Sequence, residues 1–152
     1  MLLKPTVSDG IALLLVALIS GAAYYLAPQR RADLIVAPET GCDLQFKTCT
    51  ARLPDGGHLA LSILPRPIPV ISPLLIEVRL VGLDAADMHI ELTGVDMAMS
   101  QNRTQLTVAA PGIYRGTAML PVCVSGKMKW QATVIFDAHA TRIAVPFNFV
   151  SG

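Results

Sequence analysis

Sulfur-bearing side chains are the residues of this chain best suited to chemistry, because it has six methionines and three cysteines but few other candidate ligands. Thioether and thiolate sulfur are soft ligands that favour Cu(I). Met97 and Met99 would lie on one side of an extended backbone, about 7 Å apart along it. Cys123 follows Met119 near the end of another expected strand. The candidate copper ligands are therefore Met97, Met99 and Cys123.

Core packing is the alternative interpretation of these residues, because methionine often fills irregular gaps in cores and free cysteine behaves as a small apolar group. Met88 shares a strand phase with Ile90 and Leu92, so we expect it in a core. Met128 shares the phase of Trp130, and the same expectation applies to it. For Met97, Met99 and Cys123, packing and copper binding both remain open.

Motifs for catalysis are missing from the sequence. His58, His89 and His139 stand alone, and we expect all three at solvated positions. The sequence contains no Gly-x-Ser-x-Gly elbow, phosphate-binding loop or dinucleotide glycine fingerprint. The formal net charge of +1 argues against a nucleic-acid partner bound through a basic surface. We therefore expect a protein that is not an enzyme and does not bind nucleic acid.

Cys42 and Cys49 are separated by six residues, a spacing that predicts a disulfide across a bend or between adjacent strands. Two free thiols or a metal-binding pair are the alternatives. A disulfide persists only in an oxidising compartment, so this pair places the domain outside the cytoplasm. The flanking charges favour the opposite orientation, because Lys4 precedes the longest apolar run whereas Arg30 and Arg31 follow it.

Residues 10–29 carry no charge, and as a helix they would span about 30 Å, which matches the hydrocarbon core of a bilayer. We expect a transmembrane helix here, after an N-terminal tail at 1–9. The run is long for a cleaved signal peptide, which is the alternative. Its small residues would let neighbouring helices approach closely, and these candidates are Ser20, Gly21, Ala22 and Ala23.

Residues 30–41 read as a linker, and 42–152 read as one β domain. Apolar and polar residues alternate along several short segments, which are residues 57–64, 76–80, 88–92, 103–109, 113–122, 127–136 and 142–149. About seven or eight strands separated by turn residues predict an all-β, immunoglobulin-like antiparallel β-sandwich, with a small barrel as the alternative. We expect Trp130 to anchor its core. The proline-rich segment 64–73 is interpreted as an extended link between the two sheets.

The segments Gly94–Arg103, Gly112-Ile-Tyr-Arg-Gly116, Met119–Val124 and Met128-Lys-Trp130 carry a resemblance to a known family. In this pattern, which covers most of residues 74–150, the chain resembles small membrane-anchored periplasmic sandwiches of the FixH/YtkA-like kind. The resemblance implies a role in the assembly of haem–copper oxidases and in copper handling outside the cytoplasm. Carried over by position, it implies only Met97, Met99 and Cys123 as copper ligands, although no histidine joins them in sequence.

These observations lead to one functional hypothesis and two alternatives. The first is a single-pass accessory or assembly subunit of a respiratory-type, haem–copper oxidase-like complex in the bacterial inner membrane, with its β domain in the periplasm. The lipid bilayer and other membrane-protein subunits would be its partners. The alternatives are a periplasmic Cu(I)-binding metallochaperone, with copper as its cofactor, and a non-catalytic adhesion or binding module.

Overall fold

The computed structural model describes residues 16–21, 32–36, 41–54, 56–96, 102–121, 126–139 and 141–151. The chain divides into two compact units, Met1–Arg30 and Arg31–Gly152. In the first unit, residues 16–21 are helical. None of the described residues belongs to a helix that is long and apolar enough to cross a membrane. The rest of the expected membrane span, residues 10–15 and 22–29, lies outside the described residues.

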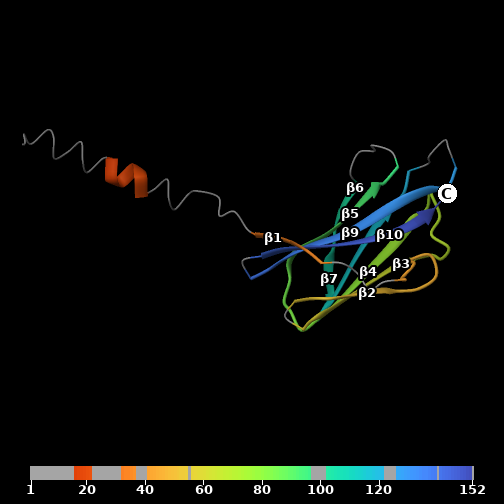
Figure 1. Ribbon diagram of the computed structural model, residues 1–152, viewed down its shortest axis with the longest axis horizontal. Helices are drawn as coiled ribbons and strands as arrows, with labels where there is room; N and C mark the ends of the chain where they lie inside the picture. The colour runs from red at the N-terminus through yellow and green to blue at the C-terminus, as the bar shows by residue number, and fades with distance from the viewer. Residues whose placement is uncertain are drawn as a thin grey trace, which may run out of the picture. The chain divides into compact units, whose positions relative to one another are not determined.

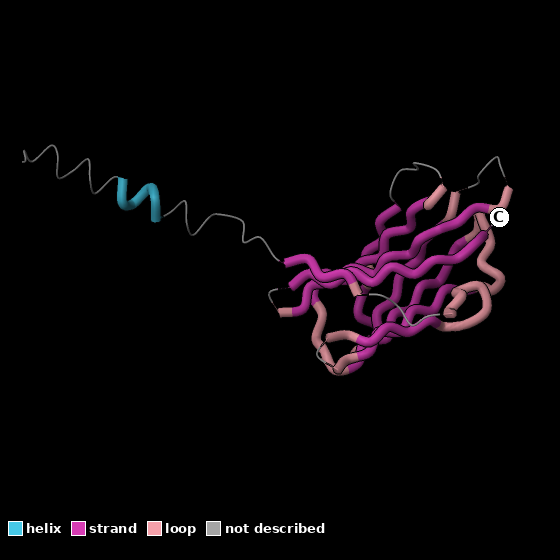
Figure 2. Tube along the Cα trace, viewed as in Figure 1, coloured by secondary structure: helices cyan, strands magenta, loops and turns pink. Residues whose placement is uncertain are grey.

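The second unit consists of strands arranged in two five-stranded sheets (Figures 1 and 2). Sheet A has the order β1-β10-β9-β5-β6, and sheet B has the order β2-β3-β4-β8-β7. The strands are β1 (Ala32–Ile35), β2 (Cys49–Arg52), β3 (His58–Leu64), β4 (Pro73–Val81), β5 (Ala86–Gly94), β6 (Asn102–Gln105), β7 (Thr107–Ala110), β8 (Ile113–Met119), β9 (Met128–Ala138) and β10 (Thr141–Ser151). This arrangement confirms the expected all-β sandwich.

The core lies between the two sheets and is filled by alternate residues of each strand. Along β9 and β10 the buried and less buried positions alternate over almost the whole length, as a strand with one face toward a core requires. Trp130, Phe136 and Phe147 are among the largest fully buried side chains. Met88 and Met128 are also buried, so the core positions expected for both methionines and for Trp130 are confirmed.

The first strand lies within the range expected as a linker. β1 pairs in parallel with the start of β10, from Ala32 opposite Thr141 to Ile35 opposite Ala144. The N–H of Val36 extends this pairing by donating to the carbonyl of Ala144 over 2.9 Å. An edge strand of four residues is too short to show alternation, which is why the sequence reads as a linker there. In sequence, only Arg30 and Arg31 stand between the uncharged run and β1.

The segment expected as one strand over 103–109 forms two strands that belong to different sheets. β6 pairs with β5 in sheet A, whereas β7 pairs with β8 in sheet B. Leu106 lies between them, is buried, and donates its N–H to the carbonyl of Met88 over 2.9 Å. Gly116 on β8 makes room for this crossing, because a Cβ there would lie 2.6 Å from Leu106 Cδ2.

The expectation that residues 64–73 cross between the sheets is wrong. β3 and β4 are antiparallel neighbours in sheet B, with Leu64 opposite Leu75. Residues 65–72 form a loop between them, and this proline loop reaches sheet A through one hydrogen bond instead. Ser151 Oγ at the end of β10 donates to the carbonyl of Ile68 over 2.5 Å. The loop therefore closes one end of the sandwich.

Candidate functional site

Two ends of the sandwich can be distinguished by the direction of β10. At the entry pole, β1 and β10 both begin, because the two strands are parallel. At the distal pole, β10 ends and β9 begins, since Ser151 lies opposite Met128. In Figure 1 the distal pole is the end of the domain marked with the C-terminus. The disulfide loop, which is the segment 41–48, and the proline loop both lie at the distal pole.

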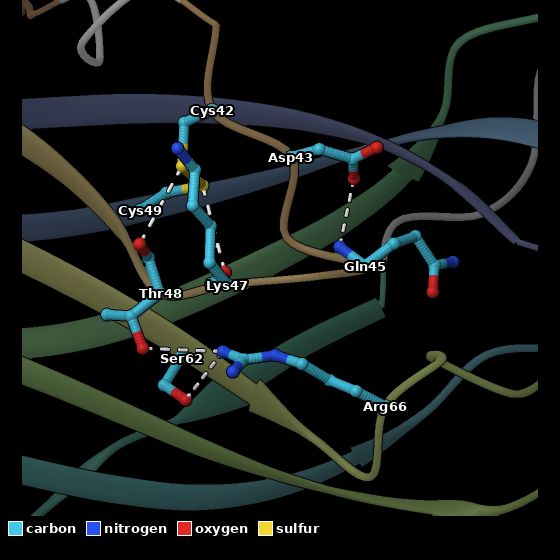
Figure 3. Close-up of a disulfide and its surroundings, with 8 residues drawn as sticks. All are labelled: Cys42, Asp43, Gln45, Lys47, Thr48, Cys49, Ser62 and Arg66. Atoms are coloured by element: carbon cyan, nitrogen blue, oxygen red, sulfur yellow. Dashed lines mark hydrogen bonds between the residues drawn. A yellow bond between two sulfur atoms is a disulfide. The ribbon is translucent and has the colours of Figure 1, made fainter.

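A disulfide joins Cys42 to Cys49 (Figure 3), with a Cα–Cα distance of 5.6 Å. Cys49 is the first residue of β2 and is fully buried, whereas Cys42 is partly exposed. The expected disulfide is thus confirmed, and the free-thiol and metal-pair interpretations of these two residues are wrong. The bond closes the disulfide loop onto the edge of sheet B.

One side chain of this loop, Gln45, connects three separate segments. The backbone N–H of Gln45 donates to Asp43 Oδ1 over 2.9 Å, which holds the loop in a tight turn (Figure 3). Its Oε1 accepts the N–H of Ile68 in the proline loop over 2.6 Å. Its Nε2 donates to the carbonyl of Val150 on β10. Gln45 therefore fixes the disulfide loop against both the proline loop and sheet A.

Arg66 makes a second link between the proline loop and the disulfide loop (Figure 3). Arg66 Nη2 donates to Ser62 Oγ over 3.0 Å and to Thr48 Oγ1 over 3.4 Å. Its contacts with β3 and with the disulfide loop come from the same nitrogen. The disulfide, Gln45 and Arg66 together hold the disulfide loop, the proline loop and the end of β10 in one fixed arrangement at the distal pole.

Two hollows adjoin Val150 at this pole. The larger has a volume of about 390 Å³, and its lining includes Asp43, Val95, Lys129, Gln131 and Asn148 as well as Val150. On this surface Gln131 Nε2 donates to Asn148 Oδ1 over 3.2 Å. The smaller has a volume of about 250 Å³ and is lined by Asp43, Gln45, Phe46, Pro67, Lys127, Val150 and Ser151. Because both hollows are lined by Asp43 and Val150, they adjoin each other and together form one site, the Val150 groove.

The sequence did not indicate the Val150 groove. It is assembled from residues near positions 43–46, 95, 127–131 and 148–151, which are far apart along the chain. The sequence feature that could have indicated this surface is Phe46, a lone aromatic residue in a polar loop. Its side chain is 80% exposed, more than any other large apolar side chain among the described residues.

The expected copper ligands, Met97, Met99 and Cys123, all lie outside the described residues. The described strand ends on either side of them meet at the distal pole. Asn102 Nδ2, at the start of β6, donates to the carbonyl of Met119, at the end of β8, over 2.8 Å. Within the described part of the chain, no group of three histidine, cysteine or carboxylate side chains could hold a metal ion.

Two other polar clusters lie away from the groove. On sheet B, Glu77 accepts hydrogen bonds from Arg79 and Arg115, both over 2.8 Å. These bonds, with that of Arg79 as the largest cause, lower the pKa of Glu77.

The expectation of a solvated His89 is wrong, because only 4% of the residue is exposed. Beside it, the register of β5 and β9 shifts between Ala86 and His89.

Of the other histidines, His58 and His139 are exposed, as expected. Of the candidate helix-packing residues, Ser20 and Gly21 belong to the helical residues 16–21, and a Cβ added at Gly21 would meet no atom within 4 Å. Ala22 and Ala23 lie outside the described residues.

No protein-family model, curated protein or solved structure matches this chain.

Proposed function

We propose that this protein is a single-pass accessory or assembly subunit of a respiratory-type, haem–copper oxidase-like complex in the bacterial inner membrane, with its sandwich in the periplasm. The uncharged run at 10–29 supports a membrane anchor. The disulfide supports an oxidising compartment. The resemblance to FixH/YtkA-like proteins is what favours a haem–copper oxidase over other membrane complexes.

The observation that carries this proposal is the position of β1. Because β1 begins at Ala32, the sequence between the uncharged run and the sandwich is only Arg30 and Arg31. Two extended residues span at most about 7 Å. A tether of that length would restrict the domain to the membrane surface, which suits a subunit of a membrane complex better than a freely ranging carrier.

We also propose that the sandwich is of the immunoglobulin-like type. Sheet B contains β3, β4, β8 and β7 in that order, and sheet A contains β5, β9 and β10 as neighbours. These are the orders of strands A, B, E and D and of strands C, F and G in that fold. Domains of this type present loops at the two ends of the sandwich, and the Val150 groove lies at one such end.

Co-purification from native membranes tests the proposed role. The tagged full chain, extracted in a mild detergent, should migrate on a native gel with other membrane subunits that show haem absorbance. Replacing Ser20 and Gly21 with leucine should weaken this association, because bulky residues keep helices apart. The matched control replaces Val16 with leucine and should leave it unchanged. A chain that is always extracted alone would contradict the proposal.

A topology measurement tests the compartment independently. Alkaline phosphatase fused after residue 151 should be active in intact cells, because this enzyme needs disulfides that form outside the cytoplasm. An inactive phosphatase fusion, with activity instead from a cytoplasmic reporter at the same site, would refute the proposed orientation.

Copper binding is a second candidate function, favoured by the meeting of the strand ends that flank 97–101 and 122–125. The hydrogen bond from Asn102 to Met119 joins two of these ends. Titration of the full chain with Cu(I) against a coloured chelator should then show about one bound ion. Replacing Met97 and Met99 with leucine should abolish binding, whereas Met88→Leu in the core should not. Unchanged binding in the double variant would exclude this site.

A further inference from the structure

The Val150 groove exposes apolar side chains from three segments of the chain. Phe46 in the disulfide loop is 80% exposed, Val95 after β5 is 54% exposed, and Val150 on β10 is 43% exposed. Exposed apolar side chains around a hollow are typical of a surface that binds another molecule, and aromatic residues contribute most at such surfaces. The hydrogen bonds of Gln45 fix the loop that carries Phe46 against β10 and the proline loop.

The charge around the groove is positive. Lys127 lines one hollow and Lys129 the other, and both are exposed. Neither lysine has an ion-pair partner among the residues that the structure describes. Asp43 is the one carboxylate in the lining of either hollow, and its Oδ1 already accepts the N–H of Gln45. The groove therefore complements a partner that brings negative charge.

The neighbouring edge of β10 is poorly suited to strand addition. The carbonyl of Ala144 points to the edge of β10 where β1 pairs, since it accepts the N–H of Val36. Every second residue points its backbone groups to the same edge, so beyond β1 the backbone groups there belong to Pro146, Asn148 and Val150. Pro146 has no N–H, and the carbonyl of Val150 already accepts from Gln45. A partner would gain few backbone hydrogen bonds here, so side chains entering the hollows would have to supply the affinity.

We infer that the Val150 groove binds an acidic segment of a partner protein, with an aromatic or aliphatic side chain seated against Phe46 and Val150 and carboxylates facing Lys127 and Lys129. This inference rests on the proposed accessory role and specifies the chemistry of the partner. The groove lies at the pole opposite the start of β1, so the N-terminal connection does not begin beside it.

Defined peptides test the inference on the full chain in detergent micelles. The probe is a short fluorescent peptide with one phenylalanine flanked by aspartates. Its counterparts replace the aspartates with lysines or the phenylalanine with alanine. Fluorescence anisotropy should show saturable binding of the acidic phenylalanine peptide, with roughly tenfold weaker binding of each counterpart, the scale expected for losing one hot-spot contact.

Variants of the groove sharpen the test. Phe46→Ala should weaken binding roughly tenfold, whereas Val81→Ala, another exposed apolar side chain but at the entry pole, should not change it. Replacing Lys127 and Lys129 with glutamate should reverse the preference, so that the basic peptide binds better. Unchanged circular dichroism would show that each variant is folded, as expected for exposed positions.

Several outcomes would overturn the inference. Equal binding of the acidic and basic peptides would remove the role of the lysines, and binding unaffected by Phe46→Ala would place the site elsewhere. Concentration-dependent dimers that Phe46→Ala abolishes would identify a second copy of the chain as the occupant instead. Peptide binding in micelles needs no membrane complex. Failure of the peptide test with intact co-purification therefore refutes this inference alone, and the reverse result refutes the accessory role alone.

Discussion

Removal of the disulfide should destabilise the sandwich by an amount that follows from the short loop it closes. Cys42 and Cys49 are 7 positions apart. A cross-link of this span restricts the unfolded chain enough to contribute about 2.5 kcal/mol to the free energy of unfolding in the chain-entropy treatment. If the loop then moves and the two side-chain bonds of Gln45 are lost, the total rises toward about 4 kcal/mol. For a domain of this size the smaller value corresponds to a fall of about 10 °C in Tm.

Unfolding in urea measures this effect, because Trp130, the one tryptophan of the sequence, is buried in the core and reports on unfolding by fluorescence. The variant with both Cys42 and Cys49 replaced by alanine is compared with Cys123→Ala, which removes a cysteine but keeps the disulfide. Each single replacement should cost about as much as the double, since the pair acts as one unit. Additive single effects, or a double variant less than about 1 kcal/mol below the parent, would refute the reasoning.

Three further predictions concern the framework of the sandwich. Trp130→Ala should lower the free energy of unfolding by about 3–5 kcal/mol. Trp130→Phe should lower it by much less, because the indole N–H is buried with no hydrogen-bond partner in the described part of the chain and its removal breaks no bond. Equal losses in the two variants would contradict this. Gly116→Ala should cost about 1–3 kcal/mol in the same unfolding assay, because its Cβ would overlap Leu106, and a neutral result would mean that the crossing can relax. The lowered pKa of Glu77 means that its ion pairs stabilise the fold above pH 4.5, the ordinary pKa of the group, and lose this effect as pH falls through the lowered value. Because both arginines are more than half exposed, the effect should be at most about 1 kcal/mol and should disappear in Glu77→Gln, as stability measured against pH would show.

The strongest elements could be predicted because their residues alternate. β9 and β10 keep one apolar face over most of their length, which is why Trp130 could be placed in the core from sequence. β6 and β7 could not be separated, because Leu106 continues the run without any turn residue and only the packing against Gly116 and Met88 shows the break. The pattern gives the strands, but the sheet to which each belongs depends on contacts distant in sequence.

The features of the candidate site likewise divide into those that local sequence predicts and those that depend on distant contacts. The disulfide could be predicted, because the spacing of Cys42 and Cys49 is a local property of the sequence. The burial of His89 could not, since its ring lies against Arg103 of β6 and beside an irregularity in pairing, and alternation reveals neither. Nor could the Val150 groove, because Lys129 becomes a neighbour of Val150 only when β9 pairs with β10, and Phe46 only when Gln45 joins the disulfide loop to β10.

The parallel direction of β1 decides how the N-terminal connection and the groove are arranged in the domain. An antiparallel β1 on the same edge would run toward Thr141, so the chain that precedes it would arrive from the Val150 end of β10. The observed register instead starts β1 opposite Thr141, nine residues before Val150 on β10. At about 3.3 Å per residue this is a distance of about 30 Å. A partner at the distal pole would therefore not compete with the N-terminal connection where it enters the domain, and the proposed anchoring and the proposed docking are compatible.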